Sequence, residues 1–101
     1  MIVVRNVFQL KFGQAKEAIA AWREGMSIAQ RTGSSVSSMR LLTDLAGPEF
    51  YTLVVEGTYP SLAEFERSAQ AMTGSAEFRA WYPGFAALCV GGRREILAVV
   101  E

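Results

Sequence analysis

The chain of 101 residues is 50% hydrophobic and 20% charged, a composition typical of a globular domain, and its 10 basic and 10 acidic residues give a net charge of zero. Without a basic face, the composition gives no indication of binding to nucleic acid or to an anionic membrane. Histidine is absent, which excludes Ser-His-Asp and Cys-His catalysis, histidine-ligated haem and nearly all common zinc sites.

The single cysteine and the hydropathy pattern give expectations about location. Cys89 has no second cysteine with which to form an internal disulfide, which favours a reducing cytoplasm. No apolar run approaches the ~20 residues of a membrane helix, and a strand-like segment follows Met1 directly where a signal peptide would have a basic region. We therefore expect one cytoplasmic domain over residues 1–101, with no membrane contact, and self-association because a neutral chain lacks self-repulsion.

Residues 2–12 are expected to form the first strand, because their side chains alternate between two faces that are both substantially apolar. One face carries Ile2, Val4, Asn6, Phe8 and Leu10, and the other carries Val3, Arg5, Val7 and Gln9. Such a strand is typical of the interior of a sheet that is covered on both sides. Gly13 ends it.

The period changes to that of a helix over residues 14–31, where small and apolar residues form one stripe and charged residues lie opposite. Trp22 is the largest residue of the apolar stripe. Arg31 suits the negative end of the helix dipole, and Gly33 is placed to adopt the left-handed conformation that ends many helices.

Residues 35–44 and 50–59 are expected to form a hairpin with a turn at residues 44–48. Serines weaken the first of these strands and indicate an edge position, whereas β-branched and aromatic residues suit the second to the centre of the sheet. Pro60 stops the second strand because it has no N–H to donate. Ser61 and Glu64 then form the Ser-x-x-Glu pattern of a capping box, which begins a helix over residues 62–72.

Gly74 interrupts that helix, and a short helical segment capped by Ser75 is expected to end at Pro83-Gly84. The last strand covers residues 87–100, with a bulge or bend at Gly91-Gly92. This order of elements predicts an α+β fold of the ferredoxin-like βαββαβ type, with a four-stranded antiparallel sheet and the helices on a single face. The other face of the sheet carries apolar residues that no helix of the chain would bury. The simplest way to bury them is a second copy of the chain, which would pack sheet to sheet around a shared cavity.

Five segments spread over nearly the whole chain carry a resemblance to a known family. They are Phe8-Gln-Leu-Lys-Phe-Gly13 leading into the helix with Trp22, Tyr51 to Glu56, Tyr59-Pro-Ser-Leu-Ala-Glu-Phe-Glu66, Glu77-Phe-Arg-Ala-Trp-Tyr-Pro83 and Gly92-Arg-Arg-Glu-Ile-Leu97. Together they resemble the NIPSNAP-like branch of the dimeric α/β-barrel superfamily. The resemblance implies two ferredoxin-like protomers that form a barrel. It implies no single function, because the superfamily contains cofactor-free monooxygenases, haem-degrading enzymes, dye peroxidases, stress-responsive proteins and members with no assigned activity.

Asn6 is a first candidate site residue that the resemblance implies. The haem-degrading monooxygenases of this fold carry a first-strand Asn seven residues before the Gly that opens the helix, and Asn6 and Gly13 have that spacing. Those enzymes also use a histidine ligand, which this chain lacks, so we expect no haem and no other cofactor. A structural Asn with satisfied hydrogen bonds is the alternative.

Arg5 and Gln9 lie on the opposite face of the first strand from Asn6. They would line the cavity between two sheets if the helices cover the Asn6 face, and Arg5 would there bind a carboxylate or polarise a carbonyl. The alternative for Arg5 is an ion pair with Glu56 of the central strand or with the partner chain.

Four aromatic residues, Tyr51, Tyr59, Trp81 and Tyr82, are candidates for binding an aromatic ligand together with Asn6. In cofactor-independent monooxygenases of this fold, aromatic, Asn and Arg side chains hold a polycyclic phenolic substrate, whose own anion drives the oxygen chemistry. The alternative is that these rings belong to the core.

The charged run near the C-terminus and the single cysteine are both expected to have structural roles. Arg93, Arg94 and Glu95 are read as ion pairs at the rim of a dimer, and Cys89 as a buried small hydrophobe. No nucleophile, general base or metal site stands out in the sequence.

These observations leave three hypotheses. The first is a homodimer whose barrel cavity holds a small apolar or aromatic molecule. The second is a cofactor-independent monooxygenase acting on a phenolic or quinol-like aromatic. The third is a purely structural association module with a filled core. A packed interior would favour this third hypothesis, and an open interior would favour one of the other two.

Overall fold

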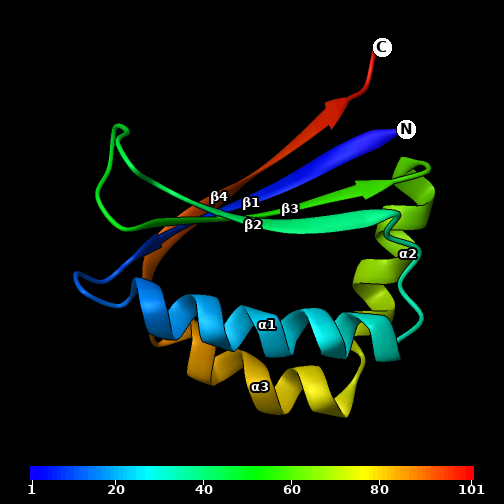
Figure 1. The fold of residues 1–101 in the computed structure, drawn as a ribbon. Coiled ribbons are helices and arrows are strands. Elements are labelled where there is room, and N and C mark those ends of the chain that lie inside the picture. Colours follow the sequence, from blue (N-terminus) through cyan, green and yellow to red (C-terminus); the bar gives the residue numbers. More distant parts are fainter.

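The computed structural model describes residues 1–101, whose elements follow the expected order (Figure 1). They are β1 (Ile2–Leu10), α1 (Ala15–Arg31), β2 (Ser38–Thr43), β3 (Thr52–Tyr59), α2 (Leu62–Thr73), α3 (Ala76–Ala86) and β4 (Cys89–Ala98). The four strands form one antiparallel sheet in the order β2-β3-β1-β4. The predicted ferredoxin-like fold is therefore confirmed, with β2 at an edge and β3 in the interior. None of the three helices has the length and apolar character needed to cross a membrane.

All three helices lie on one side of the sheet, and the other side carries none (Figure 1). Even-numbered residues of β1 face the helices. Leu10 is buried in a core cluster with Trp22 of α1, Phe8 packs against that cluster, and Val4 is buried nearer α2. Because side chains alternate along a strand, this is also the face that carries Asn6.

Helix α3 does not end at Pro83-Gly84 but continues to Ala86, so the predicted end is wrong. A proline inside a helix removes one hydrogen bond and costs about 3 kcal/mol, yet the next turn forms and the Ala87 N–H donates to the Pro83 carbonyl (3.1 Å). Phe85 explains the extension, because its side chain is only 2% exposed and packs into the main core cluster. Burial of such a ring is worth ~1.5–3 kcal/mol, which is of the same order as the cost of the proline.

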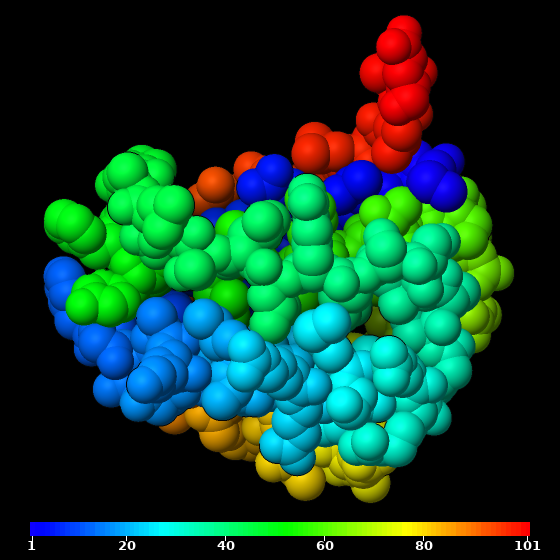
Figure 2. Space-filling model, in the orientation of Figure 1, coloured from blue at the N-terminus to red at the C-terminus, as the bar shows by residue number.

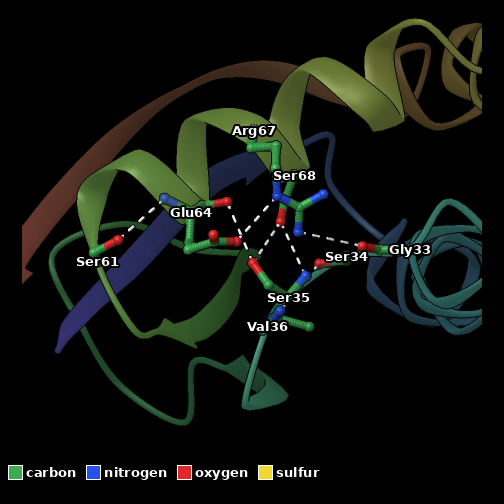
Figure 3. A network of polar contacts seen from close by, with 8 residues as sticks. All are labelled: Gly33, Ser34, Ser35, Val36, Ser61, Glu64, Arg67 and Ser68. Carbon is green, nitrogen blue, oxygen red and sulfur yellow. Dashed lines mark hydrogen bonds and ion pairs between the residues drawn. The ribbon is translucent and has the colours of Figure 1, made fainter.

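The residues before Ser38 do not join β2, which is therefore shorter than predicted. They tie the end of α1 to α2 instead (Figure 3). The Ser35 N–H donates to Oγ of the buried Ser68 (3.0 Å), and Arg67 donates to the Gly33 carbonyl (3.5 Å). The serines that weaken the strand in the sequence are thus the residues that form this junction.

The strand β3 begins at Thr52, two residues later than predicted. Tyr51 has a φ of 55°, a left-handed conformation that interrupts an extended strand, and the Asp44 carboxylate accepts a hydrogen bond from the Thr52 N–H (2.7 Å). At the other end of β3 the predicted helix start is confirmed, since Ser61 Oγ accepts from the Glu64 N–H (3.2 Å).

The pairing of β1 with β4 contains the irregularity expected near the two glycines of β4. Gln9 pairs with Gly91 and Leu10 pairs with Cys89, so Val90 is the extra residue of a bulge. The predicted bulge is confirmed, one residue before the glycine pair.

Trp81 of α3 packs against α1 at Gly25. A Cβ at this position would lie 2.8 Å from the indole ring of Trp81 and 2.9 Å from the ring of Trp22. The Nε1–H of Trp81 donates to the Ala21 carbonyl of α1 (2.9 Å). Together the ring contact and the hydrogen bond fix α3 against α1.

Gly25→Ala is expected to destabilise the protein by ~1–3 kcal/mol, because the added methyl group overpacks the contact. Alanine would otherwise stabilise a helix interior by about 1 kcal/mol relative to glycine. Gly84→Ala in α3 is the matched control, because a Cβ there meets nothing within 4 Å, and it should stabilise slightly. Urea unfolding measures both, and a Gly25→Ala variant as stable as the parent would contradict the tight contact.

Candidate functional site

A cavity of about 710 Å³ lies between the helix-covered face of the sheet and the helices. All seven elements contribute to its lining, and 15 of the 23 lining residues are hydrophobic. Helix α2 runs steeply across the direction of α1 and α3 (Figure 1), and residues of all three helices contribute to the lining. Sites for small molecules are typically ~300–1,000 Å³ and mostly apolar, so its size and character fit a small molecule.

Helix α3 supplies an aromatic wall to this cavity. Trp81 and Phe85 stack in parallel, with ring centroids 5.6 Å apart and planes 3° apart, and Phe78 stacks on Tyr82 at 5.4 Å. Trp22 of α1 stands edge-on to Trp81 at 5.0 Å. Flat ring faces of this kind suit the body of an aromatic ligand.

Arg94 and Asn6 form a polar pair in the lining of the cavity. The Nε–H of Arg94 donates to Oδ1 of Asn6 (2.7 Å), and the guanidinium carbon lies 5.4 Å from the centre of the Phe65 ring. The six ion pairs of the chain do not include Arg94. Its position is therefore set by an amide and an aromatic ring rather than by a carboxylate.

Burial shifts the pKa of two titratable groups of the lining upward. Burial raises the pKa of the Tyr59 hydroxyl, and the nearby Ser34 and Arg94 only partly oppose this effect. Burial also raises the pKa of Cys89, whose thiol lies 3.7 Å from the Phe85 carbonyl. A raised thiol pKa disfavours the thiolate, which is the nucleophilic form, so Cys89 lines the cavity as a weakly nucleophilic thiol.

Four of the seven predicted site residues meet in this cavity. Asn6, Tyr59, Trp81 and Tyr82 all belong to its lining, although they come from β1, β3 and α3. The cavity lies on the helix side of the sheet, inside one chain, whereas we expected a cavity shared between two sheets.

The other three predicted residues lie elsewhere. Arg5 is on the opposite face of β1, within ion-pair distance of Glu56 (3.9 Å) as the alternative interpretation predicted. Gln9 shares that face and donates from Nε2 to the Phe50 carbonyl. Tyr51 lies in the loop between β2 and β3, where its ring meets Phe12 edge-on at 5.3 Å.

Sequence reasoning missed the role of Arg94. It grouped Arg94 with Arg93 and Glu95 as one charged run, but neighbouring side chains of a strand point to opposite faces. Arg93 and Glu95 pair with each other (3.3 Å), while Arg94 faces the helices beside Asn6. The alternation of β4 was the signal that separates Arg94 from its neighbours.

The fold is α+β and ferredoxin-like. On the helix side of its sheet it has a cavity large enough for a small ligand. A scan against models of known protein families finds no match, and a search of curated proteins finds none either. No group of three or more carboxylate or thiol side chains is placed to hold a metal ion.

Several solved structures are similar to this chain over nearly its whole length. A NIPSNAP family protein from Agrobacterium tumefaciens matches with a TM-score of 0.85 at 18% identity, over 99% of this chain and 86% of that one. An uncharacterized NIPSNAP domain protein from Burkholderia xenovorans matches with a TM-score of 0.86 at 14% identity, over 99% and 95%. SnoaB, a cofactor-independent oxygenase from Streptomyces nogalater, matches at 0.74 and 13% identity, over 99% and 93%. The chain therefore has the NIPSNAP-like fold that its sequence resemblance predicts.

The buried hydroxyl of Tyr59 predicts a loss of stability at alkaline pH. Its folded-state pKa lies above the usual 10.0, so the native chain keeps a proton that the unfolded chain loses. The resulting stabilisation is complete below pH ~10 and declines as the pH rises through the folded-state pKa. In urea unfolding, the free energy of unfolding of Tyr59→Phe should fall less than that of the parent between pH ~9 and ~11. An equal fall in both proteins would contradict a buried hydroxyl.

Proposed function

We propose that this protein binds a small, mostly apolar aromatic molecule in the cavity of each chain and acts as a cytoplasmic homodimer. The observation that carries the proposal is the cavity itself, whose lining combines the aromatic side chains of α3 with the Asn6–Arg94 pair. A purely structural association module would need a filled interior, so an open cavity of about 710 Å³ favours ligand binding over that hypothesis. The free thiol of Cys89 supports a reducing compartment.

The open face of the sheet supports the homodimer. Arg40, Glu56, Arg5 and Glu95 lie directly opposite one another across β2, β3, β1 and β4. Successive N–O distances along this row are 2.6, 3.9 and 3.7 Å. A two-fold axis parallel to the strands would bring β2 over the partner's β4, and β3 over the partner's β1. Every positive charge would then meet a negative one, which makes the row self-complementary.

Projecting segments flank this open face. The β2–β3 loop and the C-terminal residues rise on the side away from α1 and α3 (Figure 1), and the end of the chain stands clear of the molecular surface (Figure 2). Leu45 at the first projection is fully exposed, and Val100 at the second is 91% exposed. Apolar side chains this exposed are more stable when a partner covers them, and a second copy placed on the sheet would lie between these projections.

Leu97→Lys is expected to dissociate the dimer, because Leu97 pairs with Val3 on the open face and a lysine there would be buried against the partner without a counter-ion. Ile96→Lys is the matched control. It is 45% exposed against 49% for Leu97, but it pairs with Val4 and so faces the helix side. Sedimentation velocity at micromolar concentration should give a dimer for the parent and for Ile96→Lys, and a monomer for Leu97→Lys. A folded, monomeric parent would rule out the dimer.

Native mass spectrometry of the protein as purified tests ligand binding. We expect a dimer that carries additional mass corresponding to one small molecule per chain. Ala69→Phe, which places a ring in the cavity, should remove that mass, and Ala63→Phe, on an exposed part of α2, should retain it. Because Cys89 is the single cysteine and lines the cavity, occupancy should also slow its alkylation. A dimer at bare mass, whose alkylation rate no added naphthalene or anthracene derivative changes, would contradict the proposal.

A cofactor-independent oxygenase acting on a phenolic or quinol-like aromatic is a second candidate. Asn6, Tyr59 and Arg94 favour it, because they place hydrogen-bond donors and a positive charge at one end of an aromatic cavity. SnoaB, which has a related fold, is a cofactor-independent oxygenase. The substrate anion would supply the electrons to oxygen, and the protein would orient and desolvate it. Oxygen consumption with catechols and hydroquinones separates this candidate from simple binding.

A further inference from the structure

The cavity contains one positive charge that the chain itself does not neutralise. Its lining includes Arg93 and Arg94 and contains no Asp or Glu. Arg93 pairs with Glu95 (3.3 Å), whereas Arg94 has no carboxylate partner. We propose that the ligand carries one negatively charged group, a carboxylate or a similar planar anion, and that this group binds Arg94. The inference rests on the proposed function and specifies the chemistry of the molecule that the cavity holds.

The guanidinium of Arg94 is oriented for such a group. Asn6 Oδ1 accepts from Nε (2.7 Å), and this is the only hydrogen bond that the Arg94 side chain forms within the chain. The two terminal nitrogens therefore keep their donors free, in the planar fork that matches both oxygens of a carboxylate. The Phe65 ring supports the guanidinium at 5.4 Å, so Arg94 is held in place without using these donors.

The surroundings of Arg94 favour an anion with an apolar body. Phe65 and Tyr59 stand edge-on to each other at 5.2 Å in the same lining, and Phe78 and Tyr82 provide further ring surface. Charge pairs are stronger next to such apolar groups than in water. A ligand with a flat aromatic ring and one acidic group would contact both the rings and the exposed guanidinium of Arg94, whereas a neutral ring would leave that guanidinium paired only with water.

The experiment compares 2-naphthoate with 2-naphthamide, which has the same ring and a similar shape but no charge. In calorimetric titrations the parent protein should bind the anion at least ~10-fold more tightly, the effect of one charge-assisted contact. Arg94→Gln should abolish this preference. Arg79→Gln, the matched control, should keep it, because Arg79 is an exposed residue of α3 that does not line the cavity.

Asn6→Asp provides a second, nearly isosteric variant. It places a carboxylate against Arg94 and should abolish the preference for the anion although Arg94 is still present. Arg94→Lys keeps the charge but loses the planar fork, and should give an intermediate preference.

The outcomes separate this inference from the proposed function. Equal binding of both probes by the parent, or a preference that survives Arg94→Gln, would overturn the role of Arg94 and leave the aromatic cavity as a binding site. Binding of neither probe would overturn both proposals. Loss of the preference in Arg79→Gln as well would show that general surface charge, and not Arg94, causes the preference.

Discussion

The contact between Trp81 and the backbone of α1 is the interaction on which the rest of the structure depends. The indole donates to the Ala21 carbonyl (2.9 Å), and its ring occupies the space that the missing side chain of Gly25 leaves free. Because Trp81 also stacks on Phe85, one side chain joins α1, α3 and the main core cluster. The contact holds α3 beside α1, and residues of both helices line the cavity together with residues of α2.

The pleat of the sheet divides the polar residues of the chain into two groups with different environments. On the open face, Arg40, Glu56, Arg5 and Glu95 neutralise each other along a row of directly paired residues. On the helix face, the same strands bring Arg94 beside Asn6, an uncharged partner. A net charge of zero for the whole chain thus conceals a local positive charge, because the balancing carboxylates lie on other surfaces.

Most of the fold could be predicted from the sequence because its signals are local. The apolar stripe of α1, the cap at Ser61 and the glycine at position 33, which has a φ of 78°, each act within one or two turns of the chain. The wrong prediction concerned Pro83, where the local cost of proline was weighed without the tertiary gain from burying Phe85. The shortened β2 has a similar cause, since Ser35 finds its partner Ser68 33 residues away along the chain.

The candidate site could be predicted only in part, because a cavity depends on how helices diverge and not on any residue pattern. Asn6, Tyr59, Trp81 and Tyr82 were identified from residue type and family resemblance, while their meeting in one space follows from the angle of α2. The position of Arg94 on the helix face can be predicted from strand alternation alone once the face that carries Asn6 is known. A charged run on a strand is therefore better read as two separate sets of residues, one for each face. In this protein that reading assigns Arg93 and Glu95 to the open face of the sheet, and Arg94 to the helix face beside Asn6.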